Sequence, residues 1–169
     1  LLEWKGRAEG MIIIRNILLI LLALFLQTSW IDAISIVGIK PDLVLIVLVF
    51  VGITRGQIEA TALGFLSGLL LDIYNPEWMG VNALANSLVG FAVGYSRIGI
   101  VAEDIKVQTA ILFSATLLHD IIYFIFYAIS NASNLVFLVL QQGLGTALYT
   151  AVLGVLISLV LTRLLSLRI

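Results

Sequence analysis

The chain has 169 residues, of which 62% are hydrophobic and only 11% are charged. Soluble globular domains have about 45–50% apolar and about 25% charged residues. A core of this size cannot enclose so much apolar surface, so the composition excludes a soluble enzyme, a nucleic-acid-binding protein and a disordered tail. The formal net charge of −1 predicts no polyanionic partner, and the lack of cysteine excludes disulfides and thiolate metal sites.

The N-terminal ten residues differ from the rest of the chain because they are polar, and Met11 follows them directly. We expect residues 1–10 to be an upstream extension or an expression remnant, and residues 11–169 to form a single transmembrane helical domain. The stretch that follows resembles a signal peptide, since Arg15 precedes an apolar run. However, no small-x-small cleavage site follows that run. It is therefore predicted to be a retained membrane span.

Six apolar segments emerge when the charged residues are used as boundaries. A helix needs about 20 apolar residues to cross a hydrocarbon core of about 30 Å. The first, fifth and sixth segments are long enough, whereas the second and third cross only by borrowing flanks such as Ile34–Ile39 or by thinning the bilayer. No run alternates with period two, so we predict an all-α integral membrane protein, a compact bundle of about six transmembrane helices. The segments are Ile12–Ile31, Leu43–Thr54, Ala60–Leu71, Val81–Ser96, Val107–Ile129 and Leu135 to about Leu165, the last with an irregular start marked by Gly143 and Gly145.

The basic residues predict the orientation of this bundle. If the N-terminus is cytoplasmic, every basic residue except Lys40 falls on the cytoplasmic side, which follows the positive-inside rule. An odd number of spans would move the C-terminal pair to the other side, so both termini are predicted to be cytoplasmic. The residues on the cytoplasmic side are Lys5, Arg7, Arg15, Arg55, Arg97, Lys106, Arg163 and Arg168.

Small residues repeat every four positions on the third and fourth segments. This spacing places them on one helix face and lets two helix backbones approach closely. We favour packing within the bundle; the alternative is a face that docks another membrane protein. The third segment carries Ala60, Gly64, Gly68 and Asp72, and the fourth carries Asn82, Asn86, Gly90 and Gly94.

The loop between these two segments is rich in turn residues. Pro76 blocks helix continuation, Gly80 is expected to supply a positive φ, and Asn82 is expected to cap the next helix. Asp72 is either solvated at the interface or buried in the bundle, where it would hydrogen-bond the loop or a neighbouring span. In the same way Asp42, directly after Pro41, suits the start of the second helix.

His119 and Asp120 lie near the middle of the fifth segment and are the sharpest polar signal in the chain. Ionisable groups inside a membrane are functional candidates by default. Adjacent helical positions point about 100° apart, which argues against a catalytic dyad on one face. Three roles are open: a structural contact inside the bundle, contact with a partner protein together with Tyr123, or a proton or ligand pathway. A single histidine among scattered acids leaves no transition-metal site, and no cofactor is expected.

Four stretches of this chain resemble the rod shape-determining protein MreD family. The family pattern is a proline and an acid or amide before a span, a helix end of the form G-x-x-x-G-x-x-x-D, and a loop that closes in leucine-glycine; Met79 stands here in place of that leucine. The resemblance assigns the family's aspartates to Asp72 and Asp120 and its loop glycine to Gly80. The stretches are Pro41-Asp42-Leu43-Val44-Leu45-Ile46, Gly64 to Asp72, Met79-Gly80-Val81-Asn82-Ala83-Leu84 and Val89-Gly90-Phe91.

The resemblance implies a non-enzymatic inner-membrane component of the bacterial elongation complex, which maintains rod shape and directs peptidoglycan insertion. It implies three partners: an MreC-type single-span protein, a RodA-type glycosyltransferase with its class B penicillin-binding protein, and the MreB filament. The alternative is a vitamin-binding component of an energy-coupling-factor transporter, since those components are also similar small six-span bundles. Such components usually carry small residues at spacing four in the first span, where this chain offers only Ala23.

Overall fold

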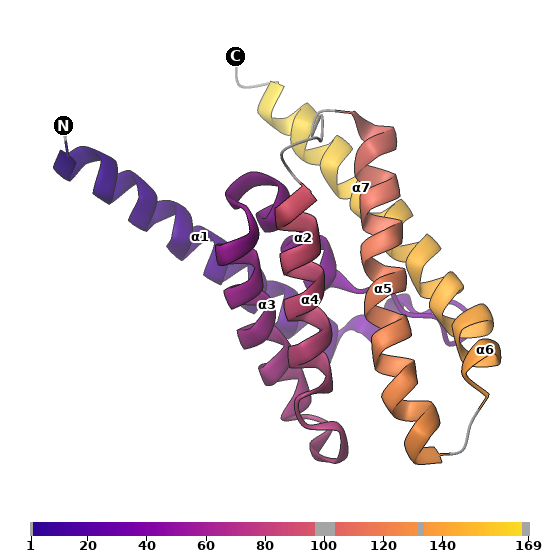
Figure 1. Cartoon of the computed structure of the whole chain (residues 1–169). Helices are drawn as coiled ribbons and strands as arrows, with labels where there is room; N and C mark the ends of the chain where they lie inside the picture. Colours follow the sequence, from indigo (N-terminus) through magenta and orange to yellow (C-terminus); the bar gives the residue numbers. More distant parts are fainter. Residues whose placement is uncertain (1, 97–103, 132–133, 167–169) are drawn as a thin grey trace.

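The computed structural model describes residues 2–96, 104–131 and 134–166, and this part of the chain is helical without β-strands (Figure 1). The all-α class is therefore confirmed. Arg97 and Arg168, two of the basic residues used to predict orientation, lie outside the described residues. In chain order the elements are α1 (Leu2–Ser29), η1 (Ile31–Ile34), α2 (Leu43–Arg55), α3 (Gln57–Asp72), η2 (Pro76–Trp78), α4 (Val81–Ser96), α5 (Ile105–Asn131), α6 (Leu135–Leu138), the π-helical turn η4 (Val139–Gly143) and α7 (Leu144–Ser166).

Three helical segments of the described chain are long and apolar enough to cross a membrane: Glu9–Ser29, Ile105–Ile129 and Leu135–Leu159. They correspond to the first, fifth and sixth predicted spans. By contrast α2 has 13 residues and α3 and α4 have 16 each, which gives lengths of roughly 20 Å and 24 Å at a rise of about 1.5 Å per residue. These three helices are shorter than a hydrocarbon core of about 30 Å.

The segment between α1 and α2 does not lengthen the second span as a helix, so the alternative of borrowed flanks is wrong for Ile34–Ile39. Ile36 and Ile39 form an antiparallel bridge around a tight turn, in which Val37 and Gly38 have φ values of 53° and 81°. Positive φ at two successive residues is incompatible with an α-helix. The hydroxyl of Tyr149 on α7 donates to the carbonyl of Ile34 at 2.7 Å and ties this irregular segment to the bundle.

The two stripes of small residues pack against each other, as the preferred interpretation of their spacing predicted. A Cβ atom added at Gly64 would lie less than 3.0 Å from the backbone of Asn86, and one added at Gly68 would collide with the backbone of Asn82. The same holds for Gly90 against Ala60. The backbones of α3 and α4 therefore touch along their length, and the two helices form a tight antiparallel hairpin (Figure 1).

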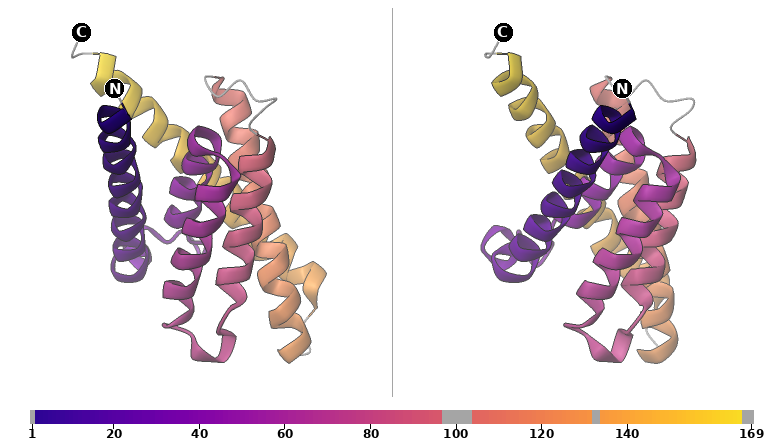
Figure 2. Two further views of the ribbon diagram at one scale, coloured as in Figure 1. Left: turned by 60° about the vertical axis from the view of Figure 1, so that its left-hand side comes forward. Right: turned by 90° about the vertical axis from the view of Figure 1, so that its left-hand side faces the viewer.

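The core of the bundle surrounds α2, whose residues Leu45, Leu48 and Val51 are fully buried. They pack in one cluster with residues of α3, α4, α5 and α7, whereas α1 reaches α2 through a smaller cluster around Ile20 and Ala23. Figures 1 and 2 show that the N-terminal part of α1 leans away from the other helices. They also show that the first turns of α1 and the last turns of α7 lie at the same end of the molecule.

The last predicted segment starts irregularly, as Gly143 and Gly145 suggested. The π-helical turn η4 ends at Gly143, between α6 and α7. Gly145 lies against the side chain of Ile39, so that a Cβ there would be only 2.6 Å from its Cδ1 atom. The irregular turn therefore sits where α7 meets the segment between α1 and α2.

Candidate functional site

One cavity of about 440 Å³ brings together most of the polar residues singled out by the sequence. It lies between the C-terminal end of α1, the segment before α2, the C-terminal end of α3, the middle of α5 and the start of α7. Its candidate residues are Pro41, Asp42, Asn82, His119, Asp120 and Tyr123, and its other lining residues include Gln27, Lys40, Asn75 and Gln142. The structure thus places side chains from five helices around one space.

Asp42 caps α2, as predicted. Its Oδ1 accepts the backbone N–H of Leu45 at 2.9 Å, and its own N–H donates to the hydroxyl of Thr150 on α7 at 2.9 Å. The side-chain oxygen of Gln27 on α1 accepts two further N–H groups of the first turn, those of Leu43 and Val44. The free donors of this buried helix end are thus satisfied from α1 and α7, which fixes α2 at the wall of the cavity.

Asp72 is fully buried and serves as the cap of the next helix. Its two oxygens accept the backbone N–H groups of Gly80, Asn82 and Ala83 at 2.9–3.1 Å, and the side-chain amide of Asn82 at 2.9 Å. The prediction that Asn82 caps α4 is wrong, because Asn82 lies inside the first turn of α4 and donates to the carboxylate. Gly80 has the predicted positive φ, 94°, which turns the loop back toward Asp72.

His119 and Asp120 are in contact, which the argument from helix geometry did not expect. Nδ1 of His119 lies 3.1 Å from Oδ1 of Asp120. The Cα–Cβ bonds diverge by about 100°, but the two side chains rotate toward each other about their own torsions. His119 is 6% exposed and Asp120 is 8% exposed, and Nε2 of the first and Oδ2 of the second have no hydrogen-bond partner within the described chain.

Tyr123 is next to this pair on the following turn of α5. Its ring is nearly parallel to the ring of His119, with centroids 6.3 Å apart, and it contacts Phe124 edge-on. The wall formed by α5 thus combines two unpartnered polar atoms with aromatic surface. Gly143 faces the same wall, since a Cβ there would be 3.8 Å from Oδ2 of Asp120.

Four of the predicted residues, Gly64, Gly68, Asp72 and Gly80, do not line the cavity. Gly64 and Gly68 lie in the α3–α4 contact described above, and Asp72 and Gly80 support the cavity only through the loop and Asn82. Within residues 2–96, 104–131 and 134–166, no three His, Asp or Glu side chains gather in a way that would hold a metal ion.

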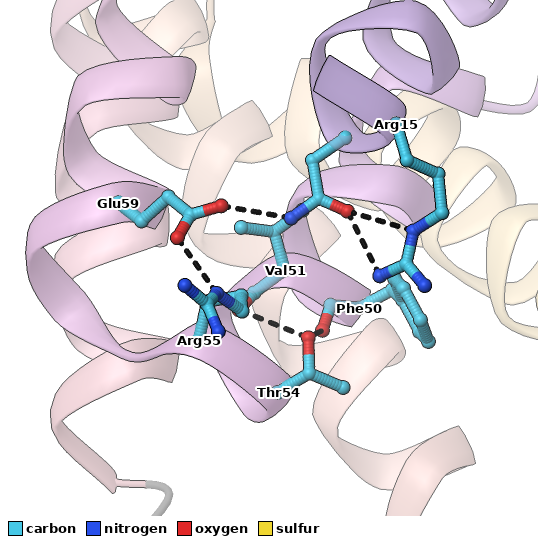
Figure 3. Close-up of polar contacts among 7 residues, drawn as sticks. Arg15, Phe50, Val51, Thr54, Arg55 and Glu59 are labelled. Atoms are coloured by element: carbon cyan, nitrogen blue, oxygen red, sulfur yellow. Dashed lines mark hydrogen bonds and ion pairs between the residues drawn. The ribbon is translucent and has the colours of Figure 1, made fainter. Parts of the chain in front are cut away.

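A second polar cluster, drawn in Figure 3, lies where α2 ends and α3 begins, whereas the cavity lies at the start of α2 and the end of α3; it was not predicted from the sequence. The amide of the fully buried Asn16 donates to Oε1 of Glu59 at 2.8 Å and accepts from the guanidinium of Arg15. Arg55 donates to Oε2 of Glu59 at 2.8 Å, and this ion pair raises the pKa of Arg55 above its ordinary value. Arg55 and Glu59 are four residues apart, a spacing that could have indicated the pair; the link to Asn16 spans 43 positions and left no local signal.

Comparison with known families adds one finding. A family model described as rod shape-determining protein MreD matches residues 9–168, nearly the whole chain. Comparisons with curated proteins and with solved structures gave no match. The family match confirms the resemblance noted in the motifs around Asp42, Asp72 and Gly80.

Proposed function

Because the chain belongs to the family of rod shape-determining protein MreD, we propose that it acts as a non-enzymatic component of the bacterial elongation machinery in the cytoplasmic membrane. In this proposal it binds an MreC-type single-span protein and works with a RodA-type glycosyltransferase, its class B penicillin-binding protein and the MreB filament. The observation that carries the proposal is the match of the family model over residues 9–168. These partners direct peptidoglycan insertion along the cylinder and so maintain rod shape.

The proposed arrangement in the membrane has six crossings with both termini in the cytoplasm. It is supported by the position of the helix ends, since α1 begins and α7 ends at the same end of the molecule (Figure 2). Arg15 on α1 and Arg55 at the end of α2 belong to the polar cluster around Glu59, whereas Lys40 lines the cavity near the C-terminal end of α1. This distribution agrees with the positive-inside rule.

The cavity then opens toward the outer face, and it gives a reason for the short helices. Irregular backbone at membrane depth is tolerated where it is buried in protein or lines a water-filled space. Gly38, Ile39 and Lys40 of the irregular segment line the cavity. A space lined by polar side chains in the outer half of the bundle allows α2 and α3 to be shorter than the hydrocarbon core, because these helix ends meet protein rather than lipid there.

Cell shape and partner capture test the proposal together. Depletion of the protein from a rod-shaped host should give rounded, wide cells with mislocalised wall synthesis. The tagged protein should capture the single-span MreC-type partner from detergent extracts. An unrelated multi-span membrane protein with the same tag is the control, and it should capture none.

The vitamin-transporter alternative predicts different outcomes. In that case cells keep their rod shape on depletion, and the purified protein holds a tight, stoichiometric vitamin that a thermal-shift screen detects. The similarity of this bundle to the substrate-binding components of energy-coupling-factor transporters stays a prediction. Rod-shaped depleted cells with a bound vitamin would replace the proposal made here.

A further inference from the structure

The cavity wall on α5 contains two buried polar atoms that the bundle itself leaves without partners. Nε2 of His119 and Oδ2 of Asp120 make no hydrogen bond to any described residue, although both residues are more than nine-tenths buried. Buried polar groups in proteins nearly always have partners, because an unpaired one costs about 1–3 kcal/mol. Both side chains line the cavity, so a bound group there can supply the missing partners.

The contact between the two side chains determines which kind of group fits. An ionised carboxylate can only accept, so with Asp120 ionised the Nδ1 atom that lies 3.1 Å from its Oδ1 carries a ring proton and donates it to the carboxylate. We take the imidazole to be neutral, so that Nε2 presents a lone pair and Asp120 presents a second acceptor at Oδ2. A group that satisfies both atoms must be a hydrogen-bond donor.

The charge of the cavity lining favours a cationic donor. Two carboxylates, Asp42 and Asp120, and one ammonium, Lys40, belong to the lining, which gives a formal charge of −1 with a neutral histidine. Lys40 already has an interaction within the chain. In a site of low dielectric constant such an imbalance attracts a positive charge more strongly than it would in water.

The size and the remaining walls indicate the rest of the ligand. A volume of about 440 Å³ falls within the range of about 300–1,000 Å³ typical of small-molecule sites. Ile31, Ile39 and Leu71 supply aliphatic surface. Phe124 and the stacked rings of His119 and Tyr123 supply aromatic surface, on which a cation or a flat ring can rest.

We infer that this cavity binds a small molecule that carries an ammonium group on an apolar or aromatic body. The ammonium donates to Nε2 of His119 and Oδ2 of Asp120, and the body lies against the aromatic and aliphatic walls. This site goes beyond the proposed role in cell shape, since binding of such a molecule requires neither transport nor catalysis.

A matched pair of probes tests the inference on the purified full-length chain. Tyramine has an ammonium on a phenolic body, and tyrosol has the same body with a hydroxyl in place of the ammonium. Isothermal titration at neutral pH should show tyramine binding at least tenfold more tightly than tyrosol. Equal binding of the two probes, or no binding of tyramine at millimolar concentration, would overturn the inference.

Variants then locate the binding. Asp120→Asn keeps the shape of the side chain but removes the charge, and it should reduce the preference for tyramine to nearly one. Asp104→Asn is the matched control, because Asp104 is exposed and does not line the cavity; it should keep the full preference. If Asp120→Asn does not fold, His119→Gln is the second variant. Its amide oxygen can still accept, but it lacks the imidazole ring, so it should weaken tyramine binding. If Asp120→Asn kept the full preference for tyramine over tyrosol, the probe would bind elsewhere and the inference would be refuted, whatever the result of the cell-shape experiment.

Discussion

At the scale of single residues, the carboxylate of Asp72 determines how the chain turns between α3 and α4. It is fully buried and accepts four N–H groups from Gly80, Asn82 and Ala83. Three of these donors are backbone N–H groups at the start of α4, where the helix dipole favours a negative charge. One side chain therefore closes α3, holds the loop and starts α4.

Asp72→Asn should destabilise the protein by about 1–3 kcal/mol, because the new amide keeps one acceptor and turns a nitrogen toward groups that only donate. Unfolding by sodium dodecyl sulfate in mixed micelles measures the change, and faster amide hydrogen exchange at residues 80–83 locates it. Glu77→Gln in the same loop is the control, since Glu77 is exposed, and it should be nearly neutral. Equal stability of the two variants would show that the charge of Asp72 does not hold the loop.

The cluster of Asn16, Arg55 and Glu59 gives a second prediction at the residue scale. Asn16 is fully buried on α1 and donates to Glu59 on α3, so the contact joins two helices. A double-mutant cycle of Asn16→Ala and Glu59→Ala should give a coupling energy of about 1 kcal/mol, the size typical of hydrogen bonds between membrane helices. The cycle of Asn16→Ala with the distant Asp104→Asn should give none; equal couplings in the two cycles would contradict the assignment.

At the scale of helices, the contact between α3 and α4 depends on the absence of side chains. A Cβ atom at Gly68 would collide with the backbone of Asn82 and Ala83, and backbone atoms cannot move aside as a flexible side chain can. Gly68→Ala should therefore cost about 3 kcal/mol, at the upper end of overpacking effects, and Gly68→Leu should prevent the hairpin from forming. The melting temperature in detergent checks this.

Gly10→Ala is the control for this change. A Cβ atom at Gly10 meets nothing within 4 Å, and in a helix alanine is better than glycine by roughly 1 kcal/mol. The control should be neutral or slightly stabilising. If Gly68→Ala were as stable as Gly10→Ala, the two backbones would not be in contact.

The helix boundaries were predictable, because residues next to each helix end determine where the helix begins or stops. α4 occupies the predicted Val81–Ser96 and α2 the predicted segment with one more residue, since Asp42, Arg55 and Gly80 mark ends by capping, charge and positive φ. Two local predictions were wrong because their outcome depends on side-chain conformations that the sequence pattern does not show. The cap of α4 comes from Asp72 rather than Asn82, and His119 reaches Asp120 by rotation about its own side-chain torsions.

Most residues of the candidate site could be identified from the sequence, but the sequence did not show that they line one cavity. The motifs singled out Asp42, and the intramembrane position singled out His119 and Asp120, without linking them to one another in space. Their common cavity depends on how α2, α5 and α7 are arranged, and Gln27 lines it through a contact across the bundle, while Thr150 supports it only by accepting the N–H of Asp42. No periodicity within one helix carries that information.

At the scale of the whole molecule, polar groups gather at two ends of an otherwise apolar bundle. One end holds the cluster of Arg15, Asn16, Arg55 and Glu59, and the other holds the cavity next to Lys40. The excess of positive charge lies at the first end, which the positive-inside rule assigns to the cytoplasm. The exposed α3–α4 loop belongs to the opposite side in this arrangement.

Cysteine labelling tests this topology, and the chain has no cysteine of its own to interfere. Asn75→Cys in the α3–α4 loop and Asn134→Cys before α6 are exposed positions that should react with an impermeant thiol reagent in intact cells. Asp104→Cys before α5 is equally exposed but lies at the other end, so it should react only after permeabilisation. Arg168→Cys should behave like Asp104→Cys, because an even number of crossings returns the chain to its starting side. Labelling of Arg168→Cys in intact cells would reject six crossings, and labelling of Asp104→Cys there would reverse the orientation, with the cavity then facing the cytoplasm.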